Sequence, residues 1–210
     1  MVLKIIPVGP LEVNCVLLAD EERGEALIVD PGAEGDRIAE IAGNFRVLGI
    51  LCTHGHIDHV GQVAALRERF EAPFYLHPAD LYLKNDEIWG GFGGYIKALP
   101  CPEPDVPLEE GMELRVGSVR VRVLHTPGHT PGMCCFYLER EGVLIAGDLL
   151  FKGSVGRWDL PGGDPLKLKR SLERILTELP EDTLVVCGHY EETTVGHERK
   201  FNPYLRGGIP

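Results

Sequence analysis

The sequence predicts an α/β fold of two packed β-sheets with helices on the outside, formed by one domain that spans residues 1–210. Three observations support this. Short apolar runs between turn residues predict strands. Other segments repeat apolar residues at helical spacing. Both halves of the chain place strands before a helix and further strands after it, an order that two helix-covered sheets would produce.

In the first half, the apolar runs predict five strands, over residues 3–8, 15–18, 26–29, 46–53 and 74–77. A helix begins in DPGAEG, and Ile38, Ile41 and Phe45 follow this segment at helical spacing. A second helix follows His59, and a short third one covers residues 78–84. The segment 85–107 is rich in Gly and Pro, so we expect a long loop there.

In the second half, residues 114–126 alternate at period two and predict a half-exposed strand or hairpin. Two strands follow, over 133–139 and 142–148. Asp164 caps the clearest helix of the chain, whose apolar stripe includes Leu168, Leu172 and Ile175. A last strand covers 183–189 and ends in CGH.

Composition and the N-terminal sequence limit which binding partners and which cellular compartment we expect. The net charge of −11 and the absence of a Lys/Arg run disfavour nucleic acid as a partner. Pro7, Gly9 and Pro10 interrupt the N-terminal apolar stretch, so we expect neither a signal peptide nor a membrane span, and a cytoplasmic location. The six cysteines lack CxxC spacing and are expected to be reduced. No feature of the sequence specifies an oligomeric state.

Residues that commonly bind metals follow several strands at the point where each ends. His54, His56, Asp58 and His59 form HxHxDH in CTHGHIDHVG, and three more follow later strands, namely His129 in TPGHTPG, Asp148 in IAGDLLF and His189 in CGHY. Imidazole and carboxylate bind Zn, Fe and Mn. Seven such side chains exceed the four that one structural Zn takes, and they suit two ions about 3.5–4 Å apart.

The spacing within HxHxDH also indicates metal binding. In an extended segment, residues 54 and 56 project the same way and can bind one ion, while Asp58 and His59 at the turn can face a second. Each residue alone has an ordinary alternative: Asp58 as a helix cap, Asp148 as a turn residue. The recurrence of the pattern after four strands favours the metal site.

These motifs resemble the metallo-β-lactamase superfamily. THGHIDHVG, HTPGHTPG, GDLLF and CGH occur in the family's order, and DPG at 30–32 with SVGRWDLPGG at 154–163 narrows the resemblance to short glyoxalase II-like hydrolases. The resemblance covers almost the whole chain. It implies an αββα sandwich of two mixed β-sheets flanked by helices, with the site at one edge of the sheets.

The resemblance also implies roles. His54, His56 and His129 would hold the first ion, Asp58, His59 and His189 the second, and Asp148 would bridge them. The two divalent ions, with Zn preferred over Fe or Mn, would carry a bridging hydroxide that attacks a thioester such as a hydroxyacylglutathione, and Asp58 would orient it or move its proton. Larger glyoxalase II enzymes have a C-terminal helical domain, which we do not expect in this chain because only 21 residues follow His189.

Other residues are expected to shape the small-molecule pocket. The candidates for substrate binding are Trp89, Phe92 and Tyr95 of the 85–107 loop and Arg157, aided by Arg199 and Lys200 near the C-terminus. For each aromatic residue, packing of the loop onto the core is the simpler alternative.

Three histidines and two cysteines are not expected to bind metal. His77 would start a helix, His125 would be structural or would support a ligand, and His197 would lie in a C-terminal loop. Cys52 and Cys187 would be buried at strand ends.

Alternative functions stay open. The same motifs resemble persulfide dioxygenases, which use one Fe with two His and an Asp. A third hypothesis is a metal-binding module without catalysis. The missing signal peptide disfavours a β-lactamase, and the acidic charge disfavours an RNA-processing enzyme.

Overall fold

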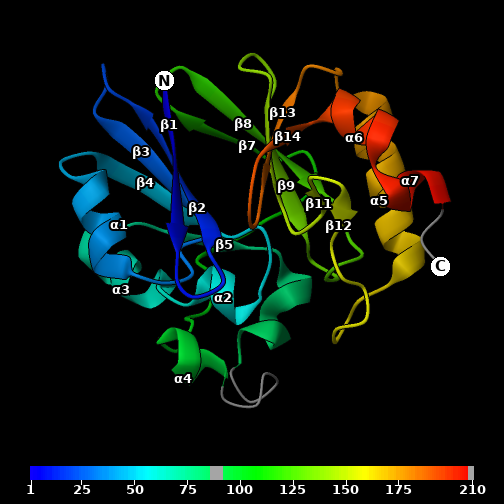
Figure 1. Cartoon of the computed structure of the whole chain (residues 1–210). Coiled ribbons are helices and arrows are strands. Elements are labelled where there is room, and N and C mark those ends of the chain that lie inside the picture. The colour runs from blue at the N-terminus through cyan, green and yellow to red at the C-terminus, as the bar shows by residue number, and fades with distance from the viewer. Residues whose placement is uncertain (86–91, 208–210) are drawn as a thin grey trace.

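The computed structural model describes residues 1–85 and 92–207, and two six-stranded sheets dominate it (Figure 1). In spatial order, the first sheet has β1 (Val2–Val8), β2 (Val13–Asp20), β3 (Glu25–Val29), β4 (Arg46–Leu51), β5 (Phe74–Leu76) and β6 (Val106–Pro107). The second has β14 (Thr193–Thr194), β13 (Leu184–Cys187), β10 (Val143–Gly147), β9 (Cys134–Leu138), β8 (Val119–His125) and β7 (Glu113–Val116). A small antiparallel pair joins β11 (Leu150–Phe151) to β12 (Ser154–Val155).

Both sheets are mixed, and each is built from one half of the chain. In the first, β1, β2 and β3 pair antiparallel, whereas β3 to β6 run parallel. In the second, β10 and β13 are parallel and all other pairs are antiparallel. This arrangement confirms the prediction of two mixed sheets flanked by helices.

The helices cover the outer faces and one edge of the sheets. They are α1 (Gly35–Ala42), α2 (Ile57–Val60), α3 (Val63–Phe70), the 3₁₀ helix η1 (Pro78–Lys84), α4 (Phe92–Ile96), α5 (Pro165–Glu178), α6 (Val195–Phe201) and α7 (Pro203–Gly207). In Figure 1, α1 and α3 lie outside the first sheet and α5 outside the second, while α2 lies at the lower edge between them. As predicted, Asp164 caps α5, accepting from the N–H groups of Leu166 and Lys167.

Three apolar layers hold this sandwich together, because neighbouring residues of a strand face opposite sides. In β2, Leu18 packs between the sheets, and Leu17 packs toward the helices of the first half. In β9, Phe136 faces the first sheet and Tyr137 faces α5. A strand that is buried on both faces therefore contributes to two layers, which explains why β2 is buried along its whole length.

Two predicted loops contain regular structure. The 85–107 segment includes α4 and β6, and Ile96 of α4 is buried in the first core layer, so packing of this side chain outweighs the Gly-rich composition. The region around His197 forms α6 rather than a loop. Thr194 caps it, and the buried Glu198 accepts hydrogen bonds from Thr193 and Gly153, contacts that the sequence pattern does not display.

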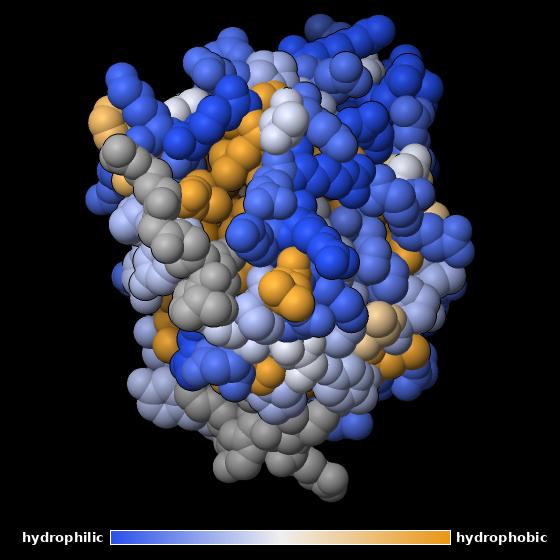
Figure 2. All heavy atoms as spheres, turned by 90° about the vertical axis from the view of Figure 1, so that its right-hand side faces the viewer, coloured by the Kyte–Doolittle hydropathy of each residue, from blue (hydrophilic) through white to orange (hydrophobic). Residues whose placement is uncertain are grey.

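The outer surface is mainly polar on the side that carries α5, α6 and α7. Figure 2 shows this face as largely hydrophilic, with hydrophobic residues gathered in its upper part and smaller hydrophobic groups elsewhere. Within residues 1–85 and 92–207, no helix combines the length and the apolar character that a membrane crossing would need.

Candidate metal centre

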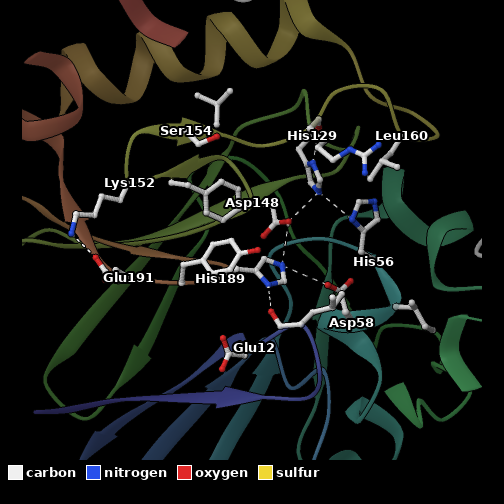
Figure 3. Close-up of a pocket in the computed structure, with 16 residues that line it drawn as sticks. Glu12, His56, Asp58, His129, Asp148, Lys152, Ser154, Leu160, His189 and Glu191 are labelled. Atoms are coloured by element: carbon white, nitrogen blue, oxygen red, sulfur yellow. Dashed lines mark hydrogen bonds and ion pairs between the residues drawn. The ribbon is translucent and has the colours of Figure 1, made fainter. Parts of the chain in front are cut away.

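All seven predicted ligands lie at one edge of the two sheets, because each follows the carboxyl end of a strand. His54 and His56 connect β4 to α2, which itself carries Asp58 and His59. His129 lies between β8 and β9, Asp148 directly follows β10, and His189 follows β13. The first sheet thus provides four of these side chains and the second sheet three. In Figure 3, Asp148 lies between His129 and His189.

The seven side chains form overlapping groups whose ligand atoms are close enough to share an ion. The ligand atoms of His54, His56 and His129 all lie within 4.8 Å of one another, and the same limit holds for Asp58, His59 and His189. His129 Nε2 is 3.1 Å from His56 Nδ1. Two nitrogens bound tetrahedrally to one Zn at about 2.0–2.1 Å would lie about 3.3 Å apart. The two triads are the sets that the family resemblance implies.

Asp148 reaches both triads. Its Oδ2 lies 3.5 Å from His129 Nε2 and 3.6 Å from His189 Nε2, and its Oδ1 lies 3.5 Å from His59 Nε2. The position between the triads suits a bridging carboxylate, although the role of each ligand remains a prediction.

Hydrogen bonds at the outer nitrogens orient the imidazoles toward the centre. His129 Nδ1 lies 2.7 Å from the Arg157 carbonyl, and His189 Nδ1 lies 2.8 Å from the Leu11 carbonyl. Because a carbonyl only accepts, each Nδ1 carries a proton, so that the neutral ring would present the Nε2 lone pair to a cation in the cluster. Metal-binding histidines are commonly oriented this way.

Two buried polar atoms of the cluster indicate whether it fits a metal ion. His54 is fully buried, and its Nδ1 lies 3.0 Å from Thr53 Oγ1. Its Nε2 has no hydrogen-bond partner among the described residues, and neither has Asp148 Oδ1. A buried polar atom without a partner is costly in a folded protein. A divalent cation would satisfy both atoms, so the donor set fits such ions.

The electrostatics of the cluster lead to the same conclusion. Burial and the nearby His59 hold the pKa of His54 well below its ordinary value. Burial also opposes protonation of His59, but Asp30, Asp58 and Asp148 raise its pKa to about 10. Burial disfavours the charged form of Asp148, yet His59 and His189 hold its pKa well below its usual range. Carboxylates thus favour positive charge at the centre, which a metal ion would supply.

A cavity of about 1020 Å³ opens onto this cluster, and His56, Asp58, His129, Asp148 and His189 form its floor. Its apolar wall includes Leu11, Phe151, Val155, Leu160 and Tyr190, and its charged groups include Glu12, Lys152, Arg157 and Glu191. Lys152 pairs with Glu191 away from the cluster (Figure 3). A mostly apolar cavity with a few polar groups is typical of small-molecule sites.

One residue of the site was not predicted as such. Asp30 is buried and follows β3, and its Oδ2 lies 3.1 Å from His59 Nδ1. It also accepts hydrogen bonds of 2.7 Å from the Thr53 N–H and hydroxyl groups, and Thr53 contacts His54. The sequence does carry a signal for this residue, because Asp30 follows a strand as the other site residues do.

The four predicted substrate residues differ in placement. Arg157 lines the cavity, and it pairs with Asp159 at 2.9 Å. Tyr95 is 67% exposed in α4 and does not line this cavity. Phe92 begins α4, and Trp89 lies outside the described residues. Of the two side chains among them that the structure describes, Arg157 lines the cavity and Tyr95 does not.

Arg199 and Lys200, which were expected to aid substrate binding, are not among the residues that line this cavity. Arg199 turns toward α5, where it pairs with Glu181 and donates to the Leu179 carbonyl. Lys200 lies over the Phe201 ring. Because α6 points these residues along its own surface, neither lines the cavity.

The remaining histidines and cysteines lie apart from the cluster. His77 caps η1 by accepting from the Ala79 N–H, as predicted, and it stacks on His125 with ring centroids 4.2 Å apart. His125 Nε2 lies 2.9 Å from the Pro131 carbonyl. Cys52 and Cys187 are buried within apolar layers, in agreement with their prediction as core residues.

The chain belongs to the metallo-β-lactamase superfamily, whose family model matches residues 8–189. An uncharacterized protein of Aquifex aeolicus is 65% identical over 97% of both chains. The probable metallo-hydrolase YqgX of Bacillus subtilis is 38% identical over 96% of both. The hydroxyacylglutathione hydrolase GloC of Haemophilus influenzae is 36% identical over 98% of both.

Solved structures share the architecture. TTHA1623, crystallised in a di-iron-bound form, is 42% identical with a TM-score of 0.86, over 96% of this chain and 100% of that one. The BLEG-1 B3 metallo-β-lactamase is 37% identical with a TM-score of 0.86, over 97% and 99%. ETHE1 from Myxococcus xanthus is 28% identical with a TM-score of 0.81, over 99% and 85%. The chain is therefore a metallo-hydrolase-type protein with a His/Asp cluster suited to divalent metal.

Proposed function

We propose that the chain hydrolyses thioesters of the hydroxyacylglutathione type, with two divalent ions held by the seven side chains. The observation that carries this proposal is the arrangement of the two triads, which share Asp148 at the floor of a mostly apolar cavity. The 36% identity to GloC over almost the full length of both chains supports the substrate class.

The ions would be divided as the geometry of the cluster suggests. His54, His56 and His129 would hold the first, Asp58, His59 and His189 would hold the second, and Asp148 lies near histidines of both triads. Two such ions would supply a hydroxide nucleophile at neutral pH and a Lewis acid for the carbonyl oxygen.

The chain itself positions the reacting groups. Asp58 lines the cavity floor, and its Oδ2 lies 3.6 Å from His189 Nε2, so this carboxylate can orient the nucleophile or take its proton. The leaving thiol has a pKa of about 8.5 and departs as a thiolate without a strong general acid. Thioesters are therefore favoured over amides.

A substrate panel tests the proposal. Metal-loaded protein is incubated with S-lactoylglutathione, other acyl thioesters and a β-lactam, beside a His54→Ala variant that loses a buried ligand. We expect thioester turnover by the native chain and almost none by the variant. Equal rates for the two proteins on every thioester would contradict the proposal, and β-lactam turnover alone would assign a different substrate.

A second function, persulfide dioxygenase, is favoured by one feature of the cluster. His54, His59 and Asp148 form a group of two His and one Asp within 4.8 Å. A facial set of two His and one carboxylate is typical of non-haem Fe(II) oxygenases. Oxygen uptake with glutathione persulfide, together with one Fe per chain, would establish this function in place of thioester hydrolysis.

A further inference from the structure

Asn14 of β2 is a buried amide that reaches from the first sheet to the second. Its side chain is 4% exposed, and its Nδ2 donates to the carbonyls of Cys187 at 3.0 Å and Tyr190 at 2.9 Å. The Asn14 backbone N–H also donates to the Gly188 carbonyl at 2.8 Å. One residue of the first sheet therefore binds the backbone on both sides of His189.

The chemistry of this contact requires an amide. A single nitrogen must donate to two carbonyls at once, and among side chains of this size only the Asn amide offers two N–H groups on one atom without a charge. An aspartate of the same shape would place acceptors against acceptors. A leucine would leave two buried carbonyls without these donors, which is costly.

The same hairpin also orients the His189 ring. Leu11, in the turn between β1 and β2, accepts from His189 Nδ1 at 2.8 Å, and Val13 forms an isolated bridge with His189. The hairpin thus fixes both the backbone and the imidazole of His189. Tyr190 follows with a φ of 62°, a left-handed conformation that strains a non-glycine residue, and its carbonyl is one that Asn14 holds.

The effect of Asn14 is specific to one triad. Asp58 and His59 come from the first sheet, whereas His189 comes from the second, so their distance depends on how the two sheets are held together at this edge. The first triad also spans both sheets through His129, but the Arg157 carbonyl orients His129, and Thr53 and Asp30 support His54 within its own sheet. The amide of Asn14 and its backbone N–H all donate to the segment that carries His189, and none of these three bonds goes to the first triad.

We propose that Asn14 is a positioning residue for His189 and, through it, for the second ion; this inference rests on the proposed metal centre. Asn14 fixes the backbone that holds His189 close to Asp58. Loss of Asn14 therefore weakens binding of the second ion and leaves binding of the first unchanged. Outer residues that orient metal ligands typically change metal affinity about 10–100-fold when they are mutated.

The test measures the dissociation constant of each Zn²⁺ ion by competition with a chromophoric chelator, and the ions per chain by elemental analysis. Asn14→Asp keeps the shape of the side chain and removes the paired donors, and Asn14→Ala is a second variant in case the first does not fold. Asn202→Leu is the matched control, because Asn202 is equally buried and donates to Ser154 at 3.0 Å and to Glu198 at 2.8 Å, away from the ligands.

We expect either Asn14 variant to weaken the second ion about 10–100-fold and to leave the first unchanged, whereas Asn202→Leu leaves both unchanged. Unchanged affinity for both ions, equal loss of both, or the same loss in Asn202→Leu would overturn the role of Asn14. A native chain that binds one ion overturns the two-ion centre and this inference with it. A native chain that binds two ions but hydrolyses no thioester overturns the proposed function alone.

Discussion

Asp30 Oδ2 lies 3.1 Å from His59 Nδ1, and both side chains are almost fully buried. The same carboxylate accepts two hydrogen bonds from Thr53, whose hydroxyl lies 3.0 Å from His54 Nδ1. One buried acid thus supports a histidine of each triad. The arrangement leaves the Nε2 atoms of His54 and His59 directed at the centre, as in carboxylate–histidine–metal sets.

The first prediction follows from this contact. Asp30→Asn removes the negative charge that supports His59, and we expect weaker binding of both ions, by about 10–100-fold. Chelator competition measures this loss. Asp36→Asn, at an exposed position in α1, is the control and should bind both ions as the native chain does. Native affinity in Asp30→Asn would show that Asp30 does not support the ligands.

A second prediction concerns the close approach of backbone to Asp148. A Cβ on Gly188 would lie 2.0 Å from Asp148 Oδ1, so Gly188→Ala must displace the carboxylate that contacts both triads. We expect loss of metal and of turnover. Gly94 of α4 is the control, since its added Cβ would meet nothing within 4 Å. Gly94→Ala should keep its metal and gain about 0.5–1 kcal/mol in stability, and metal retention by Gly188→Ala would contradict the account.

The third prediction is a pH dependence of stability away from the centre. Burial opposes the charge of Glu110, but the Arg174 guanidinium and the His125 N–H hold its pKa below the ordinary value. A lowered carboxyl pKa stabilises the fold above the unfolded value of about 4.3, and this contribution is lost as pH falls through the folded pKa.

Glu110→Gln should therefore be less stable than the native chain at pH 7, by about 1 kcal/mol or less because the pair is partly exposed. The difference should shrink toward zero in acid. Urea unfolding across this range measures it, with the exposed Glu139→Gln as control. A difference that persists unchanged in acid would exclude the ionised carboxylate as its cause.

The fourth prediction separates substrate binding from catalysis at Arg157. Its side chain lines the cavity and its exposed pair with Asp159 is weak enough to exchange for a substrate carboxylate, whereas its carbonyl holds His129. Arg157→Ala keeps the carbonyl. We expect a KM about fivefold higher or less for anionic thioesters, with kcat and the KM for a neutral thioester unchanged. A fall in kcat alone would assign the side chain a different role.

Much of the fold could be predicted from local pattern. The helix α5 is clear in sequence because its cap and apolar stripe are local signals, and β2 and β9 are clear because long apolar runs are buried on both faces. The short strands of β11, β12 and β14 have two residues each, too few to show a period. They form only because the rest of the sandwich holds them.

The seven candidate ligands could also be predicted from the sequence, since each is a metal-binding residue type at a strand end. The residues that support these ligands could not be predicted in this way. Asn14 and Asp30 act through contacts with segments far along the chain. The sequence alone does not show which of these segments lie side by side in the fold. Helix α4 was missed for a related reason, because burial of Ile96 against the first sheet stabilises a helix that its glycines disfavour.

Thioester hydrolysis by a two-ion centre is tested most directly by a Zn²⁺ titration of metal-free protein, in which S-lactoylglutathione hydrolysis is followed as ions are added. The rate should rise until two ions are bound per chain, and His54→Ala should stay inactive throughout. A rate that reaches its maximum at one ion, or no hydrolysis at any occupancy, would contradict thioester hydrolysis by such a centre.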